Sequence, residues 1–455
     1  MRIDKNTTIR LGNRNIVKVK LGDVVIWQKT TEPEPVGPDY FYIENTYAGE
    51  NTITFTTAQM GTPHSYTYAK SVEYSTDKKN WNTLTFNTST PQTITIGVGE
   101  KLYLRNDSGA FNYYDFVSFY TKINTSQNCV VGGNINTLIN YNDADNVSLR
   151  GYYGCFYMLF KNAKNITDAS NLIIPSTTIT EKYCREMFSG CTSLQNAPTL
   201  SATTLAGYSY YEMFSGCTSL LNAPQLPATT LGRYCCCNMF SGCTSLQTAP
   251  ELPATTLASN CYQSMFSGCK ALTTAPELPA TTLTDSCYYE MFSGCKALTT
   301  APELPATNLA DYCYYRMFKY CTSLTTAPAL PVTKLATSCY SNMFSGCTSL
   351  TTAPELPATT LANNCYKEMF WDCTSLTTAP ELPATTLVSS CYNYMFGGCS
   401  KLNNVTVYAN DISATDCTSR WLSGVSSNGT FRNLGSATYP TGESGIPTGW
   451  TEVKN

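Results

Sequence analysis

The sequence predicts a mainly β protein with short helices, in which a solenoid of 26-residue rungs follows a small β-hairpin and an all-β sandwich domain. The first observation is that the pair Met-Phe recurs nine times, always 26 residues apart, from Met187 to Met395. The second is that degenerate copies of this pair stand before and after the array, as Leu159-Phe160 and Trp421-Leu422. Regular repeats of this kind are typical of solenoids, in which each unit buries its apolar side chains only against its neighbours.

Three different patterns precede the repeats. Apolar and polar side chains alternate around Gly22-Asp23, which predicts a β-hairpin. A proline-containing stretch follows and predicts a stiff linker. Short alternating runs, separated by turn residues, then predict a sandwich of the immunoglobulin-like type. The predicted segments are 1–28 (attachment hairpin), 29–38 (linker), 39–145 (β-sandwich), 146–427 (solenoid of about ten rungs) and 428–455 (C-terminal cap or tail).

One rung shows how the repeat is expected to fold. Rung positions are counted from the Met, so that Met265 is position 1 of its rung. Cys287 and Met291 stand four residues apart, which predicts a short helix over residues 287–292 with Gly294 at its C-terminal corner. Prolines at positions 12 and 15 limit the following extended piece to a few strand residues. Each rung should therefore run helix turn, corner, short strand, corner, with the strands of neighbouring rungs stacked in parallel.

The cysteines follow the repeat as well. Of the 22 cysteines, nine stand at position 5 and nine at position 23, and His64 is the only histidine. Side chains in one column of a solenoid point the same way, which disfavours disulfide bonds, and the spacing with a single histidine disfavours zinc. We therefore predict buried ladders of free thiols, suited to synthesis in a reducing cytoplasm. The run 235–237 is expected to hold one ladder cysteine and two neighbours on the variable face.

The segment from Phe266 through Cys269 to Leu272, repeated from Phe344, resembles the F-x-x-C-x-x-L core of BspA-like leucine-rich repeats, and the resemblance extends over residues 159–425. It implies a leucine-rich-repeat-like solenoid and the role of a surface or secreted binding protein without catalytic residues. The chain departs from the family where Ala-Pro-Glu-Leu-Pro replaces the usual Ile or Val before Leu-Pro, which leaves the strand length open.

Two shorter resemblances concern the ends of the chain. Residues 11–27 are similar to N-terminal segments of some tailed-phage structural proteins, and residues 442–450 are similar to the ends of repeat proteins of gut bacteria and their phages. These resemblances imply a tailed phage of gut bacteria as the source of the chain.

Variation between the rungs points to a binding face. Positions 20–22 and 24–26 vary while the core positions stay constant, and position 24 is mostly Tyr. Tyr gives a large amphipathic contact area at a small loss of side-chain entropy, as in antibody paratopes. Two rungs replace the Ser-Gly corner, by Lys319-Tyr320 and by Trp371-Asp372, which adds a tryptophan to the candidates. The alternative is that the tyrosines only cover the flank of the rungs. The candidate ligand-binding residues are Tyr210, Tyr262, Tyr288, Tyr289, Tyr314, Tyr315, Tyr340, Tyr366, Trp371 and Tyr392.

Position 13 carries a recurring glutamate that would form an acidic column if these side chains share one face. Calcium prefers oxygen ligands, yet no Asn or Asp is placed to complete a shell of roughly 6–8 ligands. We therefore expect no metal site and no cofactor. The carboxylates recur with the repeat and form no unique pair, so we expect no catalytic residues and no enzyme activity. The glutamates are Glu251, Glu277, Glu303, Glu355 and Glu381.

Composition narrows the class of protein further. A net charge of −3 and a pI near 5.4 argue against nucleic acid as a partner. No stretch approaches the roughly 20 apolar residues of a membrane span, so we expect no membrane insertion. The first residues are charged and polar, and no secretory signal peptide is expected.

Together these patterns predict a virion fibre or decoration protein of a tailed phage, extracellular after lysis, that recognises a bacterial surface glycan or protein through its solenoid. Residues 1–28 would dock on a virion partner protein, and we expect a homo-oligomer, with a trimer as the usual state of fibres. The alternatives are a bacterial cell-surface adhesin of the BspA-like type and a structural spacer without a ligand.

Overall fold

The computed structural model describes residues 9–11, 14–16, 18–21, 24–28, 39–60, 70–86, 90–107, 118–149 and 153–454. The chain forms two compact units, Met1–Asp39 and Tyr40–Asn455. Strands β3 and β4 of the first unit pair antiparallel, from Lys18 with Gln28 to Leu21 with Val24. The predicted linker lies outside the described residues. In this unit the antiparallel pairs are β1 (Ile9–Leu11) with β2 (Arg14–Ile16) and β3 (Lys18–Leu21) with β4 (Val24–Gln28).

The second unit begins with two β-sheets that share a core. One sheet has the strand order β15-β13-β12-β5-β10-β7-β8, and the other has the order β11-β6-β9. Phe55 of β6 and Phe86 of β8 lie with ring centroids 5.6 Å apart, so the sheets pack against each other. The immunoglobulin-like assignment and the boundary after residue 145 stay predictions. The strands are β5 (Phe41–Asn45), β6 (Asn51–Met60), β7 (Lys70–Ser75), β8 (Asn82–Phe86), β9 (Gln92–Ile96), β10 (Lys101–Arg105), β11 (Ser118–Thr125) and β12 (Cys129–Asn134).

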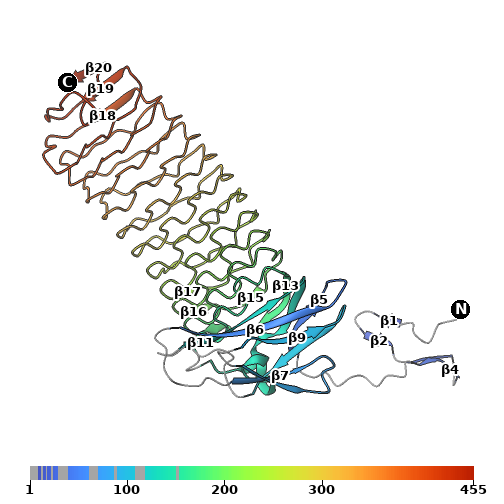
Figure 1. Ribbon diagram of the computed structural model, residues 1–455. Coiled ribbons are helices and arrows are strands. Elements are labelled where there is room, and N and C mark those ends of the chain that lie inside the picture. Colours follow the sequence, from blue (N-terminus) through green and yellow to red (C-terminus); the bar gives the residue numbers. More distant parts are fainter. Residues whose placement is uncertain are drawn as a thin grey trace. The chain divides into compact units, whose positions relative to one another are not determined.

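Strand β12 carries the larger sheet into the repeats. It pairs antiparallel with β5 and parallel with β13 (Ile166–Ile174), which in turn pairs parallel with β15 (Thr199–Leu200). Two 3-10 helices, η1 (Ile135–Leu138) and η2 (Tyr141–Asn146), follow β12. The buried residues of both regions belong to one hydrophobic cluster. The sheet therefore covers the first rungs and shields their apolar side chains from water (Figure 1).

The rungs stack in parallel but form little regular sheet. Beyond β14 (Thr178–Ile179), β16 (Thr204–Leu205) and β17 (Thr230–Leu231), the central rungs are joined by single bridges. One column of bridges at position 10 links Thr274 to Thr300 and Thr300 to Thr326. Figure 1 shows these rungs side by side, without a wide sheet. The prolines at positions 12 and 15 lack an N–H group, which explains why the strands stay short.

The predicted helix over residues 287–292 is wrong, because five consecutive turns take its place. Within the rung, the N–H groups of Cys287, Tyr289 and Met291 each donate to the carbonyl oxygen three residues earlier. The residues between them donate to the next rung, as the N–H of Tyr288 does to the oxygen of Cys313 at 3.1 Å. We call this segment, from position 20 of one rung to position 5 of the next, the turn ribbon.

The turn ribbon holds side-chain-bearing residues in the left-handed backbone region. Ser286 has φ 54°, Glu290 has φ 52° and Gly294 has φ 73°, at every fourth residue. A positive φ is what the third residue of a type II turn requires. For a residue with a side chain this conformation costs roughly 1–2 kcal/mol. Hydrogen bonds to the next rung offset the strain, such as that from the N–H of Glu290 to the oxygen of Tyr315 at 2.8 Å.

Columns of like side chains fill the core. The Phe rings at position 2 stack from Phe160 to Phe396, with centroids 5.2–5.7 Å apart. All 22 cysteines are free and buried, which confirms the predicted thiol ladders. At position 5 each thiol meets the Phe carbonyl of the preceding rung, as Cys295 Sγ donates to the oxygen of Phe266 at 3.1 Å. Burial raises the pKa of the Cys321 thiol in the same column to about 12.

The run 235–237 differs from its prediction. All three thiols are buried, so Cys236 and Cys237 do not lie on an exposed variable face. Cys236 stands at position 24, between Tyr210 and Tyr262, and interrupts the tyrosine column there. The hydroxyl of Tyr210 is buried without a hydrogen-bond partner.

The C-terminal residues cover the last rungs. Strands β18 (Asn404–Val407), β19 (Gly429–Asn433) and β20 (Trp450–Lys454) form a parallel sheet. The indole of Trp421 stacks on Tyr392 at 6.1 Å and on Tyr439 at 5.9 Å, which ends the aromatic column.

Candidate ligand-binding surface

Seven of the ten candidate residues lie in the core. Their exposed fractions are 1–2%, so their rings offer no surface to a ligand in this structure. Consecutive turns send residues out of the core in pairs: positions 23 and 24 point inward, 25 and 26 outward, and 1 and 2 inward again. Position 24 is therefore a core column, and we leave it out of the binding surface. The buried candidates are Tyr210, Tyr262, Tyr288, Tyr314, Tyr340, Tyr366 and Tyr392.

The remaining three candidates, Tyr289, Tyr315 and Trp371, are half-buried on the outer side of the turn ribbon. Two further exposed rings were not among the candidates, Tyr312 with 41% and Tyr320 with 45% of its surface accessible. Tyr312 stands at variable position 22, and Tyr320 replaces the corner glycine. The sequence shows both features, the variable position 22 and the replaced corner glycine. The prediction followed instead the abundance of Tyr at position 24.

These rings form what we call the middle cluster, defined by Tyr289, Tyr312, Tyr315, Arg316, Lys319 and Tyr320. The rings of Tyr289 and Tyr315 stack with centroids 4.7 Å apart, and Tyr312 meets Tyr315 edge-on at 5.8 Å. The guanidinium of Arg316 lies 4.8 Å from the Tyr315 ring and forms an ion pair with Glu290 at 3.1 Å. The stacked rings and the cation hold each other in place, which reduces the entropy lost on binding.

Lys319 gives the middle cluster a second cation. Its ammonium lies 5.0 Å from the centroid of the Tyr320 ring. Burial and the neighbouring charge of Arg316 lower the pKa of Lys319, and burial raises the pKa of Tyr315. The cluster therefore presents hydroxyl groups, aromatic faces and cations over two neighbouring rungs.

A second group of rings, the N-terminal cluster, lies on earlier rungs of the same ribbon. Tyr208 stacks on Tyr234 at 5.0 Å, and the guanidinium of Arg185 lies 4.6 Å from the Tyr211 ring. Burial, with the nearby Glu212 carboxylate, raises the pKa of Tyr211 to about 12.

A third group, the C-terminal cluster, consists of Trp371, Tyr394 and Arg420. Arg420 donates to the Tyr394 hydroxyl at 3.0 Å. A Cβ atom added at Gly397 would meet Cδ1 of the Trp371 indole at 3.0 Å, so the indole lies against the next rung.

Two rungs between the clusters carry only small or amide side chains on the ribbon. On the outer side, the first has Asn260, Gln263 and Ser264, and the second has Ser338, Ser341 and Asn342. In the second rung the side chains of Ser338, Asn342 and Ser345 are almost fully buried, because taller neighbours cover them. Tyr320 is one of these neighbours, since its ring occupies the space that a Cβ at Gly346 would need. We call them the small rungs.

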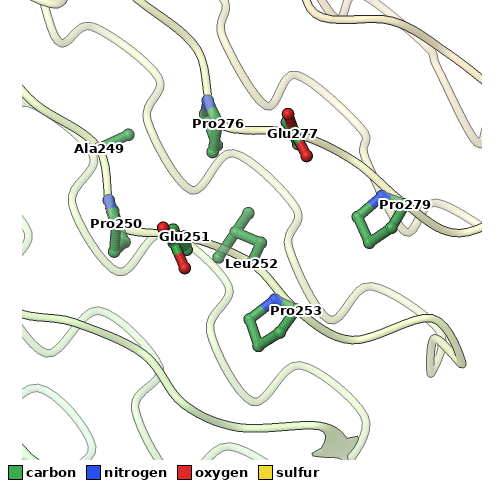
Figure 2. Close-up of a pocket in the computed structure, with 8 residues that line it drawn as sticks. All are labelled: Ala249, Pro250, Glu251, Leu252, Pro253, Pro276, Glu277 and Pro279. Carbon is green, nitrogen blue, oxygen red and sulfur yellow. The ribbon is translucent and has the colours of Figure 1, made fainter.

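The acidic column, formed by the glutamates of position 13, lies in a groove between the prolines. Hollows between successive rungs are lined by the prolines of positions 12 and 15 and by the glutamate between them, and the one beside Glu251 and Glu277 has a volume of about 520 Å³. Figure 2 shows Glu251 and Glu277 between two rows of prolines. In the described part of the chain, no group of three or more His, Cys, Asp or Glu side chains could hold a metal ion.

Comparison with known proteins agrees with this architecture. A family model described as BspA type Leucine rich repeat region matches residues 210–351 and 311–419, in six copies. Residues 210–419 are therefore similar to BspA-type leucine-rich repeats. No curated protein and no solved structure matches the chain. None of the helices in the described ranges is long and apolar enough to cross a membrane.

Proposed function

We propose that this chain is a non-enzymatic binding protein that recognises a bacterial surface molecule, with a glycan as the favoured ligand, through the outer side of the turn ribbon. The middle cluster is the observation that supports this role. It exposes Tyr312 and Tyr320 next to the cations Arg316 and Lys319 on a rigid scaffold. Apolar ring faces suit the C–H faces of sugars, while hydroxyl and guanidinium groups suit their oxygens.

The finer proposal is that the protein is a virion fibre or decoration protein of a tailed phage, attached to its particle through residues 1–28. BspA-type repeats equally suit a bacterial cell-surface adhesin, which is the second candidate, and the family match is consistent with either role. Quantitative mass spectrometry of purified phage particles and of outer-membrane fractions separates the two. Stoichiometric recovery in particles supports the virion, and recovery in membranes alone supports the adhesin.

The binding role itself is tested by substitution in the middle cluster. Tyr312→Ala combined with Tyr320→Ala should weaken binding to a glycan array or to whole bacteria about tenfold or more, because a ring that anchors a ligand contributes at least 1.4 kcal/mol. Tyr47→Ala is the matched control, since Tyr47 is similarly exposed at 44% but lies in the β-sheet region. Loss of binding in the control variant, or full binding in the double variant, contradicts the proposal. A chain that binds no glycan and no bacterium is a spacer.

A further inference from the structure

We infer that Lys122 and Lys161 form a binding site for the negative charge of an acidic sugar, where strand β11 meets the first rungs. We call Lys122, Lys161, Arg185 and Glu186 the junction site. The site lies apart from the middle cluster, but the choice of a sugar as the carrier of the charge rests on the proposed function. Three observations point to an anion: how the two lysines are held, which cations already have an acidic partner, and how the lysine charges act on each other.

Strand β11 holds one of the lysines against the rungs. It is an edge strand of the smaller sheet, and its Ile123 N–H donates to the oxygen of Leu159 at 2.7 Å. Ile123 is fully buried, whereas Lys122 points to the other face of the strand and is half-buried. Lys161 follows Leu159 by two residues and is half-buried too. The backbone thus brings both lysines to one place.

The cations of the junction site outnumber the partners that the site offers. The Glu186 side chain is 5% exposed, and its Oε1 accepts from Nε of Arg185 at 3.1 Å. Its Oε2 accepts from Nζ of Lys161, so both oxygens of this carboxylate are occupied. No carboxylate of the described residues forms an ion pair with Lys122, whose ammonium lies 5.5 Å from the centroid of the Tyr120 ring.

The unpaired charge is partly removed from water. Burial, together with the nearby charge of Lys161, lowers the pKa of Lys122. Glu212, which stands one rung after Glu186 at the same position, reduces the excess of positive charge but does not remove it. An oxyanion accepts several hydrogen bonds at once and can satisfy both ammonium groups. It can reach them from the solvent, because 25% of the Lys161 side chain stays accessible.

The surroundings of the junction site suit a sugar as the carrier of the charge. The guanidinium of Arg185 lies 5.6 Å from the Tyr157 ring and 4.6 Å from the Tyr211 ring, which links the site to the N-terminal cluster. Tyr120 and Tyr211 are half-buried, so sugar units next to the charged one can contact aromatic side chains. The charged group is a carboxylate or a sulfate ester, since both offer the same kind of acceptor oxygen.

The binding experiment uses the full chain and pairs of short sugars that differ only in charge. Calorimetry at low salt compares trigalacturonate with its methyl ester, and sulfated with unsulfated maltotriose. The charged member of at least one pair should bind about tenfold tighter than its neutral form, and the pair that differs identifies the charged group. Lys122→Gln should remove most of this difference, and Lys122→Arg should keep it. Lys270→Gln removes an exposed lysine from a later rung and is the control, with no change expected.

Thermal stability without sugar gives a second readout. Because Lys122 has no acidic partner, Lys122→Gln should leave the melting temperature unchanged or raise it. Sodium sulfate in place of sodium chloride, at equal ionic strength, should raise the melting temperature of the natural chain more than that of Lys122→Gln, because an ion bound only by the folded state stabilises it. The Lys270→Gln control should respond like the natural chain, which accounts for the general effect of sulfate on proteins.

The outcomes separate the junction site from the proposed function. Equal affinity for charged and neutral sugars, or a preference that Lys122→Gln leaves intact, overturns the site, while glycan binding through Tyr312 and Tyr320 still stands. A lower melting temperature of Lys122→Gln also counts against the site, since the lysine stem would then serve to cover Tyr120. A response to sulfate that depends on Lys122, without binding of either charged sugar, overturns the acidic sugar. A glycan array without any bound glycan overturns the proposed function separately.

Discussion

The thiol at position 5 acts as a hydrogen-bond donor and not only as a small apolar group. Nine such thiols contact the Phe carbonyl of the preceding rung, at 3.0–3.1 Å. In the middle rungs that carbonyl also accepts from an N–H group of its own rung, as the oxygen of Phe266 does from Cys269 at 3.1 Å. The thiol therefore satisfies the second lone pair of a fully buried oxygen.

This role predicts an unusual order of stability. Cys295→Ala should lower the free energy of unfolding by about 1–2 kcal/mol, through the lost volume and the lost hydrogen bond. Cys295→Ser should be at least as stable as Cys295→Ala, because the hydroxyl can still donate. In a site that is merely apolar the order is reversed, since a hydroxyl would be buried unpaired. Urea denaturation measures both variants. A Cys295→Ser variant that is less stable than Cys295→Ala would contradict the donor role of the thiol.

At the scale of one element, hydrogen bonds between rungs offset the backbone strain of the turn ribbon. Ser286 has φ 54°, and its N–H donates to the oxygen of Asp311 at 3.0 Å. Glycine adopts this conformation without a steric penalty. Ser286→Gly should therefore change the free energy of unfolding by no more than about 0.5 kcal/mol, or raise it, because relief of strain offsets the added entropy of the unfolded chain.

The control for this prediction is Ser293→Gly in the same ribbon. Ser293 is not among the residues with positive φ, so glycine there should lower the free energy of unfolding by about 0.5–1 kcal/mol. Urea midpoints compared at equal slope distinguish the two sites. Equal loss at both would show that the left-handed backbone carries no strain.

The turn ribbon also shows which features the sequence predicts and which it does not. The columns of Met, Phe, Leu and Cys follow from the 26-residue period alone, and the structure places them in the core. Cys287 and Met291 satisfy a helical spacing, but they equally satisfy turns that send two residues inward and two outward. Nothing in the residue types at Ser286 or Glu290 indicates a positive φ, since these residues reach it only through bonds to the next rung.

The errors in the candidate site have the same cause, because a helix was predicted where the chain forms turns. The sequence identified the variable positions and the replaced Ser-Gly corners, which led to Tyr289, Tyr315 and Trp371. It did not separate position 24 from position 25, because a helix would have placed both near the surface. Once the paired in-and-out pattern is known, Tyr288 belongs to the core and Tyr289 to the ribbon surface.

For the whole molecule, the long thiol ladder links stability to pH. Burial raises the pKa of the Cys321 and Cys365 thiols to about 12, and raises that of Cys269 and Cys295 strongly as well. A thiol in an unfolded chain has a pKa of about 8.5. The folded state thus keeps protons that the unfolded state loses, and stability is complete below about pH 8.5 and falls as the pH rises toward 12.

The expected loss is large because the groups act together. Each ladder thiol removes about 1.4 kcal/mol of stability for each pH unit above its unfolded pKa. The melting temperature should therefore be constant between pH 7 and 8 and fall steeply between pH 9 and 10.5, in reducing buffer. The triple variant Cys269→Ala, Cys295→Ala, Cys321→Ala should start less stable at pH 7 but lose stability less steeply, because unfolding then releases about three fewer protons. A flat profile up to pH 10.5, or equal slopes for both proteins, would contradict the ladder as the source of the effect. Since neighbouring rungs share every column, such a loss would spread from rung to rung along the solenoid.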